Sequence, residues 1–355
     1  MASTEPPIPH RAHCWRRTST KLLEESETRM LEGVKNPIET SFTKISHGNH
    51  IRTIKVGKHS DRIPLVLLHG FAGGLGFWTL NLDSLSQKQN VYAIDILGFG
   101  RSSRPKFSAD PSEAEAVFTK SLEEWRIEIG LEDFILVGHS FGGYLAAAYT
   151  LSHPKRVKHL ILVDPWGFPE VPEPGDEPIQ IPGFVKLLVN AITSFNLLAV
   201  IRAAGPLGPG LVKRARSDLK LKFERIYGEG DARIMDYIYH CNAQDPSGET
   251  AFMNMADINP FPYAKNPMIT RLKDIQTSIS LFYGEKSWME LISDFNSLVN
   301  VHEDITVEEL KGASHHVYAD NSDEFNEAVN KICDIKEFER HYHISPSKIN
   351  KETSV

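Results

Sequence analysis

The chain has 355 residues, of which 41% are hydrophobic and 24% are charged, so it can bury a sizeable core. These values exclude a wholly disordered chain, a fibrous protein and a disulfide scaffold. The 39 Lys and Arg residues against 46 Asp and Glu give a formal net charge of -7, which argues against general nucleic-acid binding. The three cysteines, Cys14, Cys241 and Cys333, are far apart, and we expect them to be thiols of a reducing compartment.

The N-terminal twenty residues lack the apolar core of a secretory signal. The most apolar segment, residues 183–205, is interrupted by Lys186 and Arg202, so it is not expected to span a membrane. The sequence therefore predicts a soluble protein, cytoplasmic and at most peripherally associated with a lipid surface.

The predicted elements begin with a helix over residues 18–34. Further along the chain, short apolar runs predict strands, and longer amphipathic stretches between them predict helices. The strands are expected at 40–46, 50–56, 64–68, 91–96, 134–137, 160–163, 278–283 and 305–310, and the main helices at 112–130 and 141–152. Apolar strands that alternate with helices are typical of a mostly parallel sheet covered on both faces. The fold class is α/β.

Between about residues 165 and 271 this alternation stops, and only Pro-rich loops and helical patterns occur. We interpret this interval as a helical cap inserted over the sheet. The predicted organisation is therefore an N-terminal extension at 1–39, an α/β domain at 40–335 that carries the cap, and a disordered tail at 336–355.

The strongest motif is Gly138-His139-Ser140-Phe141-Gly142, a Gly-x-Ser-x-Gly pattern between a predicted strand and a predicted helix. That context predicts a nucleophile elbow, in which Ser140 sits on a strained turn and the flanking glycines permit close approach. An oxyanion hole is then expected from the backbone N–H groups of Phe71, in the loop after an earlier strand, and of Phe141. We expect His69 to be a structural residue of that earlier loop.

A general base should follow near the C-terminus, and His315 lies in the loop after the last predicted strand, with His316 packed beside it. The acid that orients this imidazole is less constrained by the sequence. Glu290, 25 residues before His315, is the favoured candidate, with Asp294 and Asp164 as alternatives. No metal or organic cofactor is predicted.

Several segments carry a family resemblance. They are residues 163–169 (VDPWGFP), 204–211 (AGPLGPGL), 239–244 (YHCNAQ), 246–252 (PSGETAF) and 312–320 (GASHHVYAD). On these residues the chain resembles an α/β-hydrolase over about residues 40–335. It is most similar to the subfamily that holds a lysophospholipase/N-acyl-phosphatidylethanolamine lipase and the co-activator of adipose triglyceride lipase.

The resemblance implies a serine hydrolase of lipid esters or N-acyl phospholipids that acts in lipid homeostasis. Its alternatives are a lipid-droplet co-activator that binds a lipase, and a lysophosphatidic acid acyltransferase that uses acyl-CoA. Ser140 is present where the vertebrate co-activators have Asn, and Glu290 stands where the subfamily usually has Asp. Only Trp15 matches the tryptophan-rich N-terminal anchor of the co-activators. Asp320 completes the subfamily's His-x4-Asp pattern, and we expect it to cap the final helix.

Two features of the predicted cap suit a lipid or membrane surface. Phe184, Val185, Leu188, Ile192 and Phe195 form an apolar helical stripe, for which packing over the active site is the simpler explanation. Lys213, Arg214, Arg216, Lys220 and Lys222 form a basic strip, which a solvated helix face or an anionic lipid surface would explain. The C-terminal residues Glu352-Thr353-Ser354-Val355 are similar to peptides that PDZ domains bind.

Overall fold

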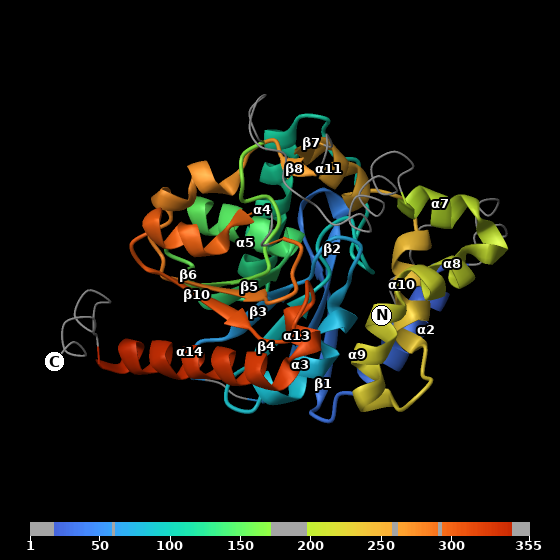
Figure 1. The fold of residues 1–355 in the computed structure, drawn as a ribbon, viewed down its shortest axis with the longest axis horizontal. Helices are drawn as coiled ribbons and strands as arrows, with labels where there is room; N and C mark the ends of the chain where they lie inside the picture. The colour runs from blue at the N-terminus through green and yellow to red at the C-terminus, as the bar shows by residue number, and fades with distance from the viewer. Residues whose placement is uncertain (1–17, 59–60, 172–196, 258–261, 290–292, 343–355) are drawn as a thin grey trace.

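The structure of the protein is a computed structural model that describes residues 18–58, 61–171, 197–257, 262–289 and 293–342. Its centre is an eight-stranded sheet in the order β1-β2-β4-β3-β5-β6-β9-β10 (Figure 1). The strands are β1 (Ile38–Lys44), β2 (His50–Val56), β3 (Leu65–Leu68), β4 (Val91–Ile94), β5 (Phe134–His139), β6 (Val157–Val163), β9 (Ile279–Gly284) and β10 (Ile305–Leu310). The six neighbouring strands β4, β3, β5, β6, β9 and β10 pair in parallel. β2 pairs antiparallel with both β1 and β4. The predicted α/β class is confirmed.

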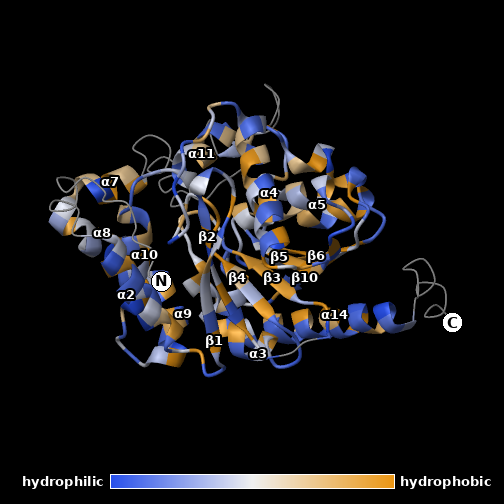
Figure 2. Cartoon of the chain, turned by 180° about the vertical axis from the view of Figure 1, so that it is seen from behind, coloured by the Kyte–Doolittle hydropathy of each residue, from blue (hydrophilic) through white to orange (hydrophobic). Residues whose placement is uncertain are grey.

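Helices cover both faces of the sheet (Figure 1). α4 (Pro111–Glu128) and α5 (Phe141–Ser152) lie on one face, and α3 (Thr79–Leu85), α13 (Val317–Asp320) and α14 (Ser322–Tyr342) lie on the other. Alternate strand residues enter two separate cores. Val66 and Leu68 face the first helix layer, whereas Leu65 and Leu67 face the second. The β3 run is apolar throughout because both of its faces are buried (Figure 2).

The cap lies between β6 and β9 in the sequence, and its described part is helical. It contains α7 (Leu197–Ala203), α8 (Gly208–Ala215), α9 (Ser217–Tyr227), α10 (Arg233–Ala243), α11 (Gly248–Met255) and the two-residue strands β7 (Ala256–Asp257) and β8 (Tyr263–Ala264). The apolar stripe predicted at residues 184–195 lies outside the described residues. The N-terminal helix α2 (Thr20–Leu31), which begins after the cap residue Ser19, packs against α10.

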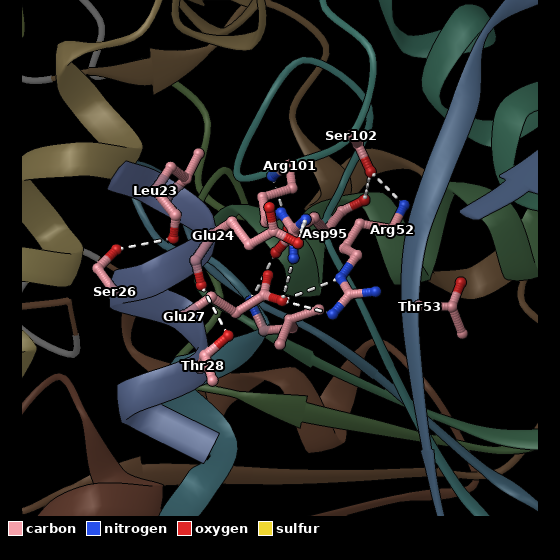
Figure 3. A network of polar contacts seen from close by, with 12 residues as sticks. Leu23, Glu24, Ser26, Glu27, Thr28, Arg52, Thr53, Asp95, Arg101 and Ser102 are labelled. Atoms are coloured by element: carbon pink, nitrogen blue, oxygen red, sulfur yellow. Dashed lines mark hydrogen bonds and ion pairs between the residues drawn. The ribbon is translucent and has the colours of Figure 1, made fainter. Parts of the chain in front are cut away.

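A buried polar network attaches α2 to the sheet (Figure 3). Glu27 Oε1 accepts hydrogen bonds from Arg52 Nη2 of β2, at 2.6 Å, and from Arg101 Nη1 of the loop after β4, at 2.8 Å. Asp95, in the same loop, accepts hydrogen bonds from Arg101 N and from Leu75 N, both at 2.7 Å. Because Leu75 directly follows the loop after β3, this network also fixes the end of that loop.

The described C-terminal residues correct one boundary. A disordered tail was predicted from residue 336, but α14 continues to Tyr342. Glu337 is buried and accepts a hydrogen bond from Ile63 N at 2.9 Å, which explains why the helix stays on the body of the protein. The PDZ-like residues 352–355 lie outside the described residues. Within the described ranges, no helix is long and apolar enough to cross a membrane.

Candidate active site

The candidate residues meet where the parallel strands end. The turn of Ser140 follows β5, Asp164 follows β6, and the loop of His315 follows β10. Parallel strands bring their carboxyl ends to one edge of a sheet, which is where α/β proteins bind ligands. Ser140 N donates to Val163 O at 3.0 Å, and Asp164 N donates to Phe282 O at 2.7 Å, so the ends of β5, β6 and β9 are locked side by side.

The nucleophile elbow is present in its predicted form. Ser140 has a positive φ of 53°, which is strained for a residue with a side chain, and α5 begins directly after it. A Cβ atom on Gly138 would lie 2.3 Å from Gly142 O, and one on Gly142 would lie 2.4 Å from His69 O. Both glycines are therefore required by close backbone contacts around the serine.

The loop after β3 lies against this elbow. A Cβ on Gly70 would come within 3.1 Å of Ser140 Cβ, and Ala72 has a positive φ of 59°. The cap residue Asn242 donates from Nδ2 to Ala72 O at 2.8 Å. Phe71 is part of this loop, and Phe141 is the first residue of α5, where an N–H has no acceptor within the helix. The placement is compatible with the predicted oxyanion hole.

His69 is a structural residue, as expected. Its Nε2 accepts a hydrogen bond from Ile96 N at 3.0 Å, and its Nδ1 lies 2.8 Å from Gly70 O. The side chain is buried, and this burial lowers its pKa to about 4. Since both ring nitrogens have backbone partners, the imidazole serves to shape the loop.

The carboxylate that contacts His315 belongs to Asp164. Its Oδ2 lies 2.5 Å from His315 Nδ1 and accepts a hydrogen bond from Ser287 Oγ at 2.6 Å. Asp164 is fully buried and has a positive φ of 45°, so the regular strand conformation of β6 ends at this residue. This contact fixes the orientation of the imidazole, because it holds Nδ1 and leaves Nε2 on the opposite side of the ring from Asp164.

This result corrects the favoured choice of acid. Glu290 was predicted to orient the imidazole of His315, but the carboxylate found at Nδ1 is that of Asp164, one of the two alternatives. Glu290 itself lies outside the described residues. Asp294, the other alternative, is exposed and precedes the short 3-10 helix Phe295–Asn300. The strand order makes this contact possible: β6, β9 and β10 are parallel neighbours, so the residue after β6 lies at the same edge as the loop after β10.

Burial also sets the protonation of this pair. It lowers the pKa of His315 to about 3, and the nearby charges of Arg216 and Lys222 act in the same direction. Burial raises the pKa of Asp164 well above its ordinary value, while the hydrogen bond from Ser287 opposes the rise. The imidazole is therefore neutral at pH 7, which is the form that can accept a proton from a serine.

His139, between Gly138 and Ser140, joins the elbow to the loop of His315. Its Nε2 lies 2.9 Å from the backbone O of His315, and the centroids of the two rings are 4.7 Å apart. His316 packs beside them, with its ring 5.2 Å from that of His139, as predicted. Sequence reasoning missed the roles of His139 and Ser287, since His139 fills a variable position of the Gly-x-Ser-x-Gly pattern and Ser287 belongs to no motif.

No group of three or more His, Cys, Asp or Glu side chains in the described ranges is arranged to hold a metal ion. Cys241 and Cys333 are both buried free thiols.

Comparison with known proteins places this geometry in a family. Residues 63–198 match the family model described as alpha/beta hydrolase fold. The chain is 46% identical over 325 residues to human 1-acylglycerol-3-phosphate O-acyltransferase ABHD5, covering 89% of this chain and 91% of that protein. The chain belongs to the α/β-hydrolase family. It is also 45% identical over 321 residues to human (lyso)-N-acylphosphatidylethanolamine lipase, covering 89% and 93%. Within the family it falls in the subfamily of these two proteins.

Solved structures share the fold at low sequence identity. The carboxylesterase CesB from Bacillus subtilis is 19% identical with a TM-score of 0.63, covering 87% of this chain and 96% of that one. A membrane phospholipase A described as a bacterial virulence factor is 20% identical with a TM-score of 0.62, covering 89% and 91%. At this identity the likeness extends to the fold alone.

The elbow can be tested without a substrate. We expect Gly142→Ala to lower the free energy of unfolding by about 3 kcal/mol or more, because its Cβ would overlap the backbone oxygen of His69. Gly210→Ala is the matched control: no atom lies near its added Cβ, and in helix α8 alanine should raise stability by about 0.5–1 kcal/mol. Urea denaturation measures both, and equal stability of the two variants would contradict the close packing of the elbow.

Proposed function

We propose that the protein is a serine hydrolase of lipid esters or N-acyl phospholipids, with Ser140 as nucleophile, His315 as base and Asp164 as the acid. The observation that carries the proposal is the contact between Asp164 and His315 Nδ1 beside a strained Ser140. A serine, an imidazole and a buried carboxylate at one edge of a sheet form the constellation that catalyses acyl transfer on several unrelated folds.

In the proposed mechanism, Ser140 Oγ attacks the acyl carbonyl carbon while His315 Nε2 takes the hydroxyl proton. The N–H groups of Phe71 and Phe141 stabilise the oxyanion. When the ester or amide bond breaks, His315 returns the proton to the leaving group, and the acyl group stays on Ser140. A water molecule, deprotonated by His315, then releases the fatty acid and restores the serine. Asp164 stabilises the imidazolium formed in each step.

The surroundings of Ser140 support an acyl substrate. Phe71, Phe252 and Trp166 form an aromatic cluster beside the elbow, with ring centroids 4.3 Å apart between the first two and 4.7 Å between the last two. Phe141 also belongs to it, 5.2 Å from Phe252. Phe71 and Phe141 supply the proposed oxyanion donors, so the carbonyl would be held where its hydrocarbon chain meets apolar rings. The relatives named as a lipase of N-acyl phospholipids and an acyltransferase support the same substrate class.

Two alternative functions remain: an acyltransferase would use the same catalytic residues, and a lipase co-activator would not use them. Acyl transfer from acyl-CoA to a lysophosphatidic acid would use the same acyl-serine and replace water by a lipid hydroxyl. A lipase co-activator, as the resemblance implies, would act through its surface and would not need Ser140. The retained serine and the buried pair beside it support the catalytic proposal over co-activation.

Ser140→Ala should lower kcat for fatty-acid release from lysophospholipid micelles or N-acyl-phosphatidylethanolamine by at least about 10⁴-fold. Ser41→Ala, an exposed serine of β1, is the control and should retain full turnover. Adding acyl-CoA and lysophosphatidic acid to the same assay separates the two enzymatic functions, since a transferase accumulates diacyl product. Unchanged turnover in Ser140→Ala would refute catalysis by this site, and stimulation of a separate lipase by that variant would favour co-activation.

For binding to a lipid surface, the structure revises the role of the basic strip. Lys213, Lys220 and Arg216 each lie within 4 Å of a carboxylate, those of Asp236, Glu224 and Asp218. Lys222 pairs with Asp320 and is largely buried. Among the described residues, Arg214 alone of the five has no carboxylate partner. The strip therefore offers little unpaired charge to an anionic lipid.

Exposed apolar side chains of the cap support binding to a lipid surface better than the basic strip does. In the described ranges, Leu207 and Leu221 are the most exposed large hydrophobic residues, at 73% and 70%. Leu211 of α8 and Ile226 of α9 are also exposed. We infer that this part of the cap meets the lipid from which the substrate is drawn, because burying such side chains in hydrocarbon is favourable.

The double substitution Leu207→Glu and Leu221→Glu should weaken co-sedimentation with phosphatidylcholine vesicles by about tenfold or more, since each leucine contributes up to about 1.5–3 kcal/mol when fully buried. Ile127→Glu is the matched control, at an exposed position of α4 in the body of the protein, and should bind as the wild type does. Equal loss in the control would show that the effect is not specific to the cap.

A further inference from the structure

The segment that carries His315 is held by a residue of the cap. Asp320 Oδ2 accepts hydrogen bonds from the backbone N and from Oγ of Ser314, at 2.8 and 2.7 Å. Lys222 of helix α9 lies with its Nζ 2.8 Å from Asp320 Oδ1 and donates to Ser314 Oγ at 3.2 Å. We call these three residues the clasp. It closes the chain into a tight loop around His315 and attaches that loop to the cap.

This arrangement corrects the expected role of Asp320. The residue was predicted to cap the final helix, but α14 begins at Ser322, and the Asp320 carboxylate instead folds back onto Ser314. The aspartate of the His-x4-Asp pattern is thus occupied in shaping the loop of the base.

The clasp is well shielded from solvent. The side chains of Lys222 and Asp320 are 11% and 14% exposed. Removing one partner would leave the other charge desolvated and unpaired, which costs far more than loss of a surface ion pair. The loop should therefore move when either charge is removed.

Other contacts on the loop come from the body of the protein. His139 Nε2 lies against the backbone O of His315, and Glu285 accepts a hydrogen bond from Gly312 N at 2.7 Å. His139 is the last residue of β5, and Glu285 directly follows β9. The body of the protein thus holds one side of the loop of His315. The clasp adds a contact from Lys222 of α9, a helix of the cap.

We propose that Lys222 and Asp320 are positioning residues through which the cap sets the orientation of His315 toward Ser140. The inference rests on the proposed function for the role of His315 as base. Neither residue touches the reacting atoms. A displacement of about 1 Å in a catalytic group can cost on the order of 10²-fold in rate, so a loosened loop should lower kcat and leave substrate binding nearly intact.

Helix α9 also provides a matched control. Arg225, one turn after Lys222, pairs with Asp323 at 2.5 Å and donates to Ser322 Oγ at 3.1 Å. It therefore joins the same cap helix to the start of α14, but it does not touch the loop of His315. The side chains of this pair are 55% and 76% exposed, so Arg225→Met tests whether loss of a cation from α9, without disturbance of the loop of His315, is enough to change turnover.

The test uses the full-length protein and the water-soluble ester p-nitrophenyl butyrate, so that binding to a lipid surface does not enter. Lys222→Met and Asp320→Asn should each lower kcat by about 10–100-fold with little change in KM. Lys222→Arg, which keeps the charge, should recover most of the activity, and Arg225→Met should turn over as the wild type does. Urea denaturation of each variant verifies that it is folded.

Hydrogen–deuterium exchange provides a second readout that needs no turnover. Amides of residues 312–319 should exchange faster in Lys222→Met than in the wild type or Arg225→Met. If the wild type hydrolyses the ester and Lys222→Met keeps its kcat, or if exchange in this segment is unchanged, the inference is wrong. A wild type without Ser140-dependent turnover would instead contradict the proposed function, and the exchange result alone would then decide whether the clasp holds the loop.

Discussion

The arrangement of the candidate site depends on the contact between Asp164 Oδ2 and His315 Nδ1. This contact joins the end of β6 to the loop after β10 across the intervening strand β9. That distance can be bridged only because the three strands are parallel and in register, so that their carboxyl ends reach the same edge. The positive φ of Asp164 shows that the regular strand conformation of β6 ends at this contact.

The cap contributes more than a cover over this edge. Asn242 of α10 holds Ala72 in the loop after β3, and Tyr237 of the same helix accepts a hydrogen bond from Gly76 N at 3.2 Å. Lys222 of α9 reaches the loop of His315. Residues of the insertion thus support both the proposed oxyanion loop and the loop of the proposed base.

The sequence was sufficient for the parts of the site that depend on local patterns. The apolar runs predicted the central strands. The glycines around Ser140 predicted the elbow, because only glycine fits where two backbone segments approach this closely. Chain order predicted His315 as the base, and the structure places its Nδ1 against a buried carboxylate. Asp164 could not be chosen over Glu290 in the same way, since its role comes from the pairing of β6 with β9, which no local pattern encodes. Asp320 is a similar case: its partner Lys222 is distant in sequence.

The most direct test of the proposed site compares Asp164→Asn with Glu290→Gln in the same turnover assay with p-nitrophenyl butyrate. Asp164→Asn keeps the shape of the side chain but removes its charge, and kcat should fall by about 10⁴-fold, as expected when the acid of a serine triad is made neutral. Glu290→Gln should retain turnover close to that of the wild type. The opposite pattern, with full activity in Asp164→Asn and loss in Glu290→Gln, would contradict the assignment of Asp164 as the acid that orients His315.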